Sequence, residues 1–202
     1  MSPFFSDLVE QAQAFSRLEI IAVLLAVAYL LLAIRQNIWC WYCAGVSTAI
    51  YIWLFIDAKL YMESVLNGFY FVMAIYGWFV WRAGANAHDA LPVTRWPLRI
   101  HGAAIGVVIL LSAINGYLLS QYTDAAFPYL DSLTTWSAIW ATFLVARKVL
   151  ENWWYWLVID IASVFIYLAR DLPLTSMLFV VYVIMIPFGL ISWSRSMREQ
   201  PA

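Results

Sequence analysis

Seven long apolar stretches constrain the fold of this chain more than any other feature of its sequence. A stretch of roughly 18 or more apolar residues with few charges is typical of a helix that crosses a bilayer. Only 11% of the residues are charged, whereas soluble domains carry about 25%. The sequence therefore predicts an all-α membrane protein with seven transmembrane helices. We expect these helices at about 18–34, 38–57, 60–81, 98–121, 128–146, 152–169 and 172–194.

The lysines and arginines of the connecting loops favour one orientation in the membrane. If the N-terminus is outside, the inner loops carry eight of these cations and the outer loops carry three. The richer side faces the cytoplasm under the positive-inside rule, so we expect the N-terminus outside and the C-terminus in the cytoplasm. The inner set is Arg35, Arg82, Arg95, Arg99, Arg147, Lys148, Arg195 and Arg198, and the outer set is Arg17, Lys59 and Arg170.

An internal repeat organises the helices. A shift of 115 residues aligns "NIWCW" at 37–41 with "NWWYW" at 152–156, and a shift of 112 applies beyond the next loop. The pairs under the second shift include Ser64 with Ser176, Tyr70 with Tyr182, Gly77 with Gly189 and Trp81 with Trp193. The repeats begin four crossings apart and so point the same way, with one linker helix between them. Transporters built from repeats place substrate at the repeat interface.

The repeat predicts a 3+1+3 layout in five parts. These are an outer N-terminal segment at 1–17, a three-helix repeat at 18–82, a linker helix at 98–121, a second repeat at 128–194 and a cytoplasmic tail at 195–202. We expect Gly77 and Gly189 to allow close helix approach between the two bundles as they rock, because small residues let helix backbones come together in membranes.

Asp160 lies near the centre of the stretch at 152–169. An ionisable group at that depth is costly and marks a functional site by default. Trp156, Ser163 and Tyr167 share its helical face at steps of three and four residues, which suits the wall of a polar pocket. Pairing with a neighbouring helix for packing alone is the alternative. The residue that aligns with Asp160 under the shift of 115 is Gly45, so the acid is not part of the symmetric scaffold.

A second polar line runs along the stretch at 60–81, where Glu63, Asn67 and Tyr70 follow at steps of four and three. Tyr182 aligns with Tyr70, so these two residues are expected to face each other across the repeat axis. Solvation at the outer membrane surface is the alternative for Glu63. An interhelical hydrogen bond, worth about 0.6–2 kcal/mol, is the alternative for Asn67.

Several tryptophans accompany the acid, among them Trp41, Trp140 and Trp156. Aromatic faces attract cations by about 0.5–2 kcal/mol per contact. A carboxylate with several indoles therefore favours a flat aromatic substrate that is cationic or uncharged. A belt of interfacial anchors is the alternative for each tryptophan.

Several classes of membrane protein are excluded because this sequence lacks the residues they require. The two lysines lie at loop edges, which excludes a retinal Schiff base, and the two histidines do not form an intramembrane haem pair. There is no H-E-x-x-H, G-x-S-x-G or Walker loop. Cys40 and Cys43 offer at most two metal ligands and are expected to be buried thiols. We therefore expect no enzyme activity, cofactor, metal or nucleic-acid partner.

Two segments resemble the PnuC-type vitamin transporters. They are "RKVLENWWYWLVIDIASVFIYLARDLPLTSMLFVVY" at 147–182 and "KLYMESVLNGFYFVMAIYGWFVW" at 59–81. The resemblance implies the 3+1+3 fold of SWEET sugar transporters. It also implies facilitated diffusion of an unphosphorylated vitamin, mainly nicotinamide riboside, across the bacterial inner membrane, followed by trapping through a cytoplasmic kinase. Relatives carry thiamine, with riboflavin as a further candidate.

The resemblance implies that Trp156, Asp160, Asn67 and Tyr70 line the pocket. Asn67 stands where riboside carriers often have glutamine, so thiamine stays open beside nicotinamide riboside. We interpret the chain as a uniporter in which Trp156, Tyr167 and Tyr182 enclose the aromatic ring of the vitamin. Asp160 and Asn67 are expected to hold its ribose hydroxyls or its carboxamide. A non-transporting receptor or scaffold stays open, as does proton or metal coupling through Asp160. A homo-oligomer is compatible with the sequence.

Overall fold

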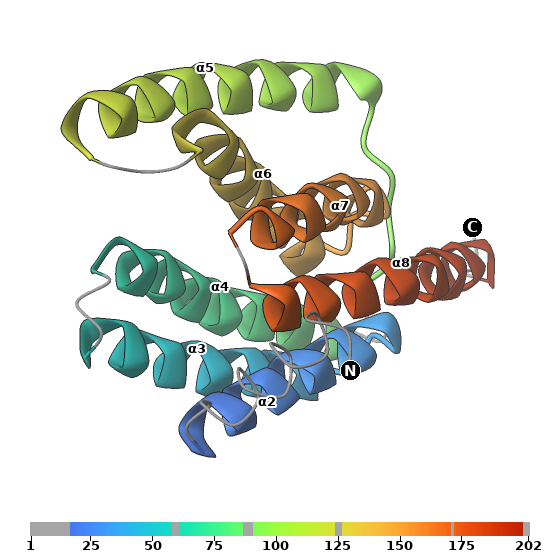
Figure 1. Ribbon diagram of the computed structural model, residues 1–202. Helices are drawn as coiled ribbons and strands as arrows, with labels where there is room; N and C mark the ends of the chain where they lie inside the picture. The colour runs from blue at the N-terminus through green and yellow to red at the C-terminus, as the bar shows by residue number, and fades with distance from the viewer. Residues whose placement is uncertain (1–16, 58–60, 87–90, 124–126, 171, 200–202) are drawn as a thin grey trace.

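The computed structural model describes residues 17–57, 61–86, 91–123, 127–170 and 172–199. Within these ranges the chain forms seven α-helices and confirms the predicted all-α class (Figure 1). They are α2 (Arg17–Ile34), α3 (Trp39–Asp57), α4 (Tyr61–Asn86), α5 (Leu98–Tyr122), α6 (Pro128–Ala146), α7 (Asn152–Leu168) and α8 (Pro173–Glu199). Residues 1–16 of the predicted outer segment, and Lys59, lie outside the described residues.

Two helices extend beyond their predicted ends. Helix α4 continues to Asn86 instead of ending at 81, and α8 continues to Glu199 instead of ending at 194. The extensions contain good helix formers, such as arginine in both and alanine in α4. Hydropathy fixes where a helix leaves the hydrocarbon, but it does not fix where the helix itself stops.

Helices α2, α3, α4, α5 and α8 are each long and apolar enough to cross a membrane. Helix α7 is apolar but has only 17 residues. The remaining helix, α6, carries more polar side chains, and many of its residues are buried, including Ser132 and Thr142. Both α6 and α7 can therefore be more polar or shorter than the others, because protein rather than lipid covers much of their surface.

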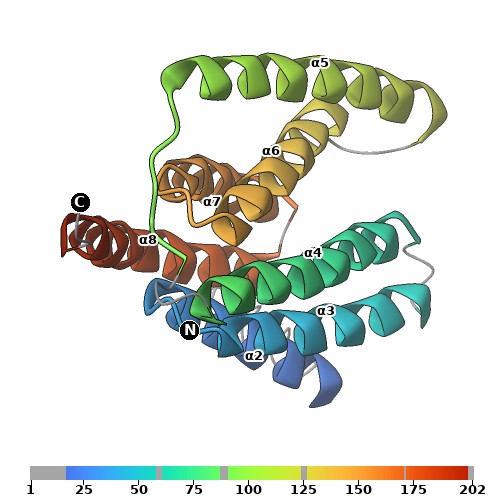
Figure 2. The same ribbon diagram turned by 180° about the vertical axis from the view of Figure 1, so that it is seen from behind.

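The helices form two bundles and a linker, which matches the predicted 3+1+3 arrangement (Figures 1 and 2). Helices α2–α4 make the first bundle and α6–α8 make the second bundle. The bundles meet where α4 contacts α6 and where α2 contacts α8. Helix α5 packs along α6 on the far side of the second bundle.

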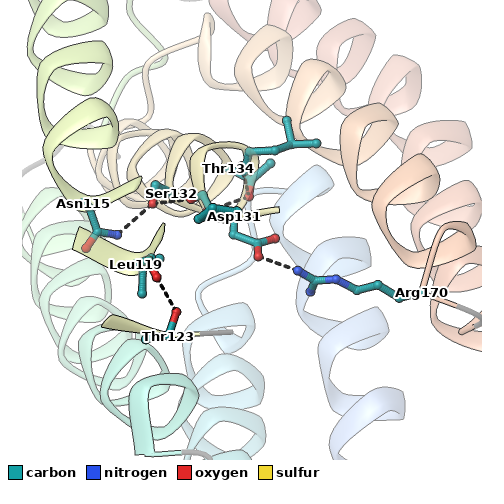
Figure 3. A network of polar contacts seen from close by, with 9 residues as sticks. Asn115, Leu119, Thr123, Asp131, Ser132, Thr134 and Arg170 are labelled. Atoms are coloured by element: carbon teal, nitrogen blue, oxygen red, sulfur yellow. Dashed lines mark hydrogen bonds and ion pairs between the residues drawn. The ribbon is translucent and has the colours of Figure 1, made fainter. Parts of the chain in front are cut away.

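A polar network attaches the linker helix near the N-terminal end of α6 (Figure 3). The Asn115 amide donates to Ser132 Oγ at 3.0 Å, and Ser112 Oγ donates to the Ser132 carbonyl at 3.3 Å. An ion pair between Asp131 and Arg170 then joins α6 to the loop that follows α7. These contacts lie on the second bundle and hold α5, α6 and α7 together.

The segment at 91–97 crosses to the linker helix along the loop between α6 and α7. The Thr94 amide donates to the Lys148 carbonyl at 3.0 Å, and the Leu150 amide donates to the Thr94 carbonyl at 2.9 Å. Val93 is buried beside them. This segment therefore ties the end of the first bundle to the α6–α7 loop of the second.

Backbone geometry shows that one shift of 112 residues relates the two bundles throughout. Gln36 and Lys148, which end the turns after α2 and α6, both have positive φ, at 53° and 50°. The hydroxyl of Ser64 donates to the carbonyl twelve residues earlier, and Ser176 makes the same contact in the second bundle. The predicted shift of 115 at "NIWCW" is therefore wrong.

The tryptophan packing leads to the same register. The indole of Trp41 covers Gly77, and the indole of Trp153 covers Gly189 in the same way. Trp41 thus corresponds to Trp153 and not to Trp156. The counterpart of Asp160 is Thr48 instead of Gly45. Letter identity favours the shift of 115, which matches both tryptophans of "NIWCW", whereas only 112 preserves both the turn and the indole–glycine contact.

Both glycines make their close approach inside a bundle, and not between the bundles as expected. A Cβ on Gly77 would lie 2.4 Å from the Trp41 ring, and one on Gly189 would lie 2.3 Å from the Trp153 ring. Each indole also meets a second tryptophan edge-on. The ring centroids are 5.3 Å apart for Trp41 with Trp81 and 5.4 Å apart for Trp153 with Trp193.

Candidate functional site

Asp160 is the most informative polar residue in the membrane-spanning part of the chain. It lies midway along α7 and is only 4% exposed. No hydrogen bond or ion pair joins its carboxyl group to any residue that the structure describes. A buried ionisable group in a membrane protein is expensive unless it is paired or faces a cavity or ligand. The structure therefore leaves this acid with unmet bonding capacity.

One tyrosine of the second bundle lies near Asp160, and a tyrosine of the first bundle lies near that tyrosine in turn. Tyr182 of α8 lies within electrostatic range of the carboxyl group. Tyr51 of α3 is close enough to interact electrostatically with both Tyr182 and Tyr167. Because α3 belongs to the first bundle and α7 and α8 belong to the second, this group lies between the two bundles. Substrate sites in transporters built from repeats occupy this position.

An aromatic wall continues from this group toward α4 and α6. Trp156, one turn before Asp160, packs on a buried cluster formed by Ala138, Ala141 and Ile159. Tyr70 of α4 packs on the same cluster from the first bundle. The small alanines of α6 let the two aromatic side chains approach that helix closely. The structure thus brings the predicted residues Trp156 and Tyr70 together.

A second aromatic group lies on α7 and α8. Tyr167 stacks on Phe179, with ring centroids 5.3 Å apart and an interplanar angle of 12°. Phe179 then meets Tyr182 edge-on at 5.7 Å. The predicted residues Tyr167 and Tyr182 are therefore linked through a phenylalanine that was not among the predicted site residues. Phe179 is the counterpart of Asn67 under the shift of 112.

The remaining predicted residues divide into three cases. Asn67 is half-buried on α4, one turn before Tyr70, and has interaction partners. Glu63 lies in α4, but its side chain is outside the described part of the structure. Trp41 lies in the core of the first bundle at 3% exposure. Trp140 faces Trp96 of the 91–97 segment, with ring centroids 6.0 Å apart. Trp41 therefore belongs to the tryptophan core of the first bundle, and Trp140 belongs to an aromatic contact with the 91–97 segment.

Sequence reasoning missed Tyr51, and the wrong register explains why. Under the shift of 112, Tyr51 is the counterpart of Ser163, which lies on the Asp160 face of α7. Tyr29 was missed as well. It lies within electrostatic range of Tyr70 and stands 6.1 Å from the Trp41 ring centroid. A single register over the whole repeat would have placed Tyr51 on the face of α3 that corresponds to the Asp160 face of α7.

Comparisons with known proteins agree with this architecture. A family model described as nicotinamide mononucleotide transporter matches residues 16–195. The nicotinamide riboside transporter PnuC of Escherichia coli (strain K12) is 25% identical over 172 residues, which cover 73% of this chain and 72% of that protein. The riboflavin/roseoflavin transporter RibM of Streptomyces davaonensis is 23% identical over 189 residues, or 90% of this chain and 86% of the relative.

A solved structure supports the fold. The crystal structure of the vitamin B3 transporter PnuC superposes with a TM-score of 0.73 and covers 98% of this chain and 92% of its own, at 19% identity. At that identity the likeness concerns the fold alone. The family model, in contrast, extends over nearly all of the sequence, from before α2 to near the end of α8. The chain therefore belongs to the nicotinamide mononucleotide transporter family, whose members are transporters and not enzymes.

Proposed function

We propose that this protein is a uniporter that carries nicotinamide riboside across the bacterial inner membrane without coupling to an ion. The observation that carries the proposal is Asp160, a buried and unpartnered acid among aromatic side chains from both bundles. In the proposed orientation the N-terminus is outside and the C-terminus is in the cytoplasm. A cytoplasmic kinase would phosphorylate the vitamin and keep it inside the cell.

The charge of the site favours the riboside among related ligands. Nicotinamide riboside carries a positive charge on its aromatic ring, which a carboxylate and nearby aromatic faces attract. The mononucleotide adds a phosphate of about −1.5 to −2 charge at pH 7. That phosphate would need a cationic partner, and no described lysine or arginine pairs with Asp160. Thiamine is also cationic and stays open as an alternative.

We assign roles to the predicted residues within this site. Trp156, Tyr167 and Tyr182 stack on or enclose the nicotinamide ring. Asp160 and Asn67 hold ribose hydroxyls or the carboxamide, and Asp160 also offsets the ring charge. Tyr70 contributes from the first bundle, so that one ligand contacts both bundles. Glu63, Trp41 and Trp140 stay predictions, with Trp41 and Trp140 the least supported by their packing.

Riboflavin is a second candidate because the RibM relative aligns over most of the chain. Its neutral ring system would leave the Asp160 charge without an offset. Transport of riboflavin would therefore depend little on that charge, whereas transport of a cationic ring would depend on it strongly. Conservative replacement of Asp160 separates the two substrates for this reason.

The test is uptake of radiolabelled nicotinamide riboside, thiamine and riboflavin into proteoliposomes without any ion gradient. We expect saturable riboside uptake that equilibrates without accumulating, and at least a tenfold loss of affinity in Asp160→Asn. Loss of a charged hydrogen-bonding partner costs about 1.5–3 kcal/mol, which corresponds to about 10- to 150-fold. Asp57→Asn is the matched control, because Asp57 is an exposed acid at the end of α3.

Each contrary outcome replaces part of the proposal. Preference for thiamine or riboflavin would replace the substrate but keep the transporter. Accumulation driven by a pH gradient and lost in Asp160→Asn would replace uniport by proton coupling. Riboside binding by folded protein without any uptake would favour a receptor or scaffold.

A further inference from the structure

Several hydrogen bonds join the two bundles at the end where α2 and α6 terminate. Trp81 of α4 donates from its indole to the Ala146 carbonyl at 3.1 Å, and its counterpart Trp193 of α8 donates to the Ala33 carbonyl at 2.9 Å. Ser192 Oγ adds a bond of 2.8 Å to the carbonyl next to Ala33. From this end α4 and α6 diverge toward their opposite ends (Figures 1 and 2).

One of these contacts joins a residue to its own counterpart. Lys148 Nζ donates to Gln36 Oε1 at 3.1 Å, and the two residues are 112 positions apart. A contact between counterparts lies on the axis that relates the two bundles. The axis passes between the bundles, and the Asp160 group also lies there. Lys148 and Gln36 therefore lie between the bundles at this end of the protein, as the Asp160 group does midway along α7.

The surroundings of Lys148 hold its ammonium group in place. The residue is only 6% exposed, and lysine is almost never fully buried unless it is paired. Its Nζ lies 4.6 Å from the centroid of the Trp81 ring, within the range of a cation–π contact. Its backbone is also in the left-handed region, which is uncommon for a residue other than glycine. A costly conformation and a buried charge persist here because the surrounding contacts hold them.

We propose that Lys148 and Gln36 form the latch of a gate that closes this end of the transport route. In the proposed orientation this is the cytoplasmic end, so the inference rests on the proposed function. The latch and the two indole–carbonyl bonds must separate before substrate can leave to the cytoplasm. The bond from Lys148 is charge-assisted, and such a bond is roughly twice as strong as a neutral one, so it is the strongest single hydrogen bond of those that join the bundles at this end.

Two substitutions shift the latch in opposite directions. Lys148→Met removes the donor and keeps an apolar side chain of similar length, so it favours the open state. Gln36→Glu places a carboxylate opposite the ammonium and favours the closed state. Arg198→Gln is the matched control, because it removes a cation at the same end whose described bond is to its own helix. Gln36→Glu keeps the volume of the side chain and tests the latch even if Lys148→Met folds poorly.

The readout is the distance between spin labels at Ala83 and Arg195, measured by pulsed electron paramagnetic resonance. These two positions are exposed counterparts on α4 and α8, so their separation reports the opening of this end. Labels are attached to cysteines in a Cys40→Ala, Cys43→Ala background. We expect Lys148→Met to raise the ratio of long to short distances about tenfold. We expect Gln36→Glu to lower that ratio and to slow release of substrate into the vesicle interior by a similar factor.

The two proposals fail in different ways. Distance distributions that match wild type in both latch variants would overturn the latch, whether or not the protein transports. Wild-type protein that binds riboside without uptake would overturn the uniporter and leave the distance result to judge the latch. A similar shift in Arg198→Gln would show that charge at this end, and not the contact between Lys148 and Gln36, controls the opening.

Discussion

Replacing Gly77 by alanine tests the packing that relates the two bundles. The added Cβ would lie 2.4 Å from Trp41, whereas carbon atoms in contact lie about 3.5–4.0 Å apart. The indole must therefore move by about 1 Å. It has little room to do so, because Trp41 is 3% exposed and packs edge-on against Trp81. Overpacking of this kind costs about 1–3 kcal/mol.

The same substitution also improves helix propensity, which sets the net magnitude. Alanine is more favourable than glycine by about 1 kcal/mol in a helix interior. We therefore expect Gly77→Ala to destabilise the protein by up to about 2 kcal/mol. Gly68 lies in the same helix, and nothing lies within 4 Å of its added Cβ. Gly68→Ala should accordingly be stabilising, by up to about 1 kcal/mol in a membrane-spanning helix.

The assay is reversible unfolding in mixed micelles, followed by tryptophan fluorescence. Trp41→Phe gives a smaller ring and should recover part of the stability lost in Gly77→Ala, so the double-mutant cycle should show a coupling of about 0.5–3 kcal/mol. Gly189→Ala should repeat the loss in the second bundle. A Gly77→Ala protein at least as stable as Gly68→Ala, with no coupling to Trp41, would refute the packing argument.

Two further predictions concern the end where the bundles join. Trp81→Phe removes the indole donor and leaves the Ala146 carbonyl without that partner, so unfolding should become easier by about 1–3 kcal/mol in the same micelle assay. Burial lowers the pKa of Lys148 from its ordinary 10.5 to about 8. Between these two values the unfolded state binds more protons, so the unfolding free energy should rise with pH across that window. The rise should amount to about 3 kcal/mol at roughly 1.4 kcal/mol per pH unit, and Lys148→Met should abolish it.

The class and layout of the fold could be predicted because bilayer thickness fixes the length of each apolar stretch. Each of the seven predicted stretches coincides with a helix. The extra turns of α4 and α8 could not be predicted in this way. Hydropathy describes the part of a helix in lipid, and these turns extend past that part with good helix formers.

The register of the repeat was predictable only in part. The pairing of Gly77 with Gly189 and of Trp81 with Trp193 was correct. The alignment of "NIWCW" was three residues out, because more identical residues match at the shift of 115 than at 112. The missing information was conformational, namely the two residues with positive φ that end the equivalent turns. Positive φ is typical of glycine and asparagine, and neither glutamine nor lysine indicates it. The sequence alone therefore did not predict these two turns.

The corrected register explains why one residue of the candidate site was not predicted. Trp156, Asp160 and Tyr167 could be predicted as neighbours because they follow helical spacing along one face. Tyr51 was missed because only the correct shift places it on the corresponding face of α3. Trp41 was predicted because indoles near an acid suit a cationic ring, whereas the structure places it in the core of the first bundle. The three-residue error in the register thus hid a tyrosine of the candidate site.

The corrected register also sharpens the case for Asp160. Its counterpart Thr48 donates its hydroxyl to the carbonyls of Ala44 and Gly45 in its own helix, at 2.8 and 3.1 Å. Thr48 is therefore satisfied by its own helix, whereas Asp160 has no partner among the described residues. The contacts that close one end of the protein recur in both bundles, but the acid occurs in only one. A single acid among otherwise equivalent bundles makes the candidate site asymmetric, so the proposed cationic ligand would have one preferred orientation between them.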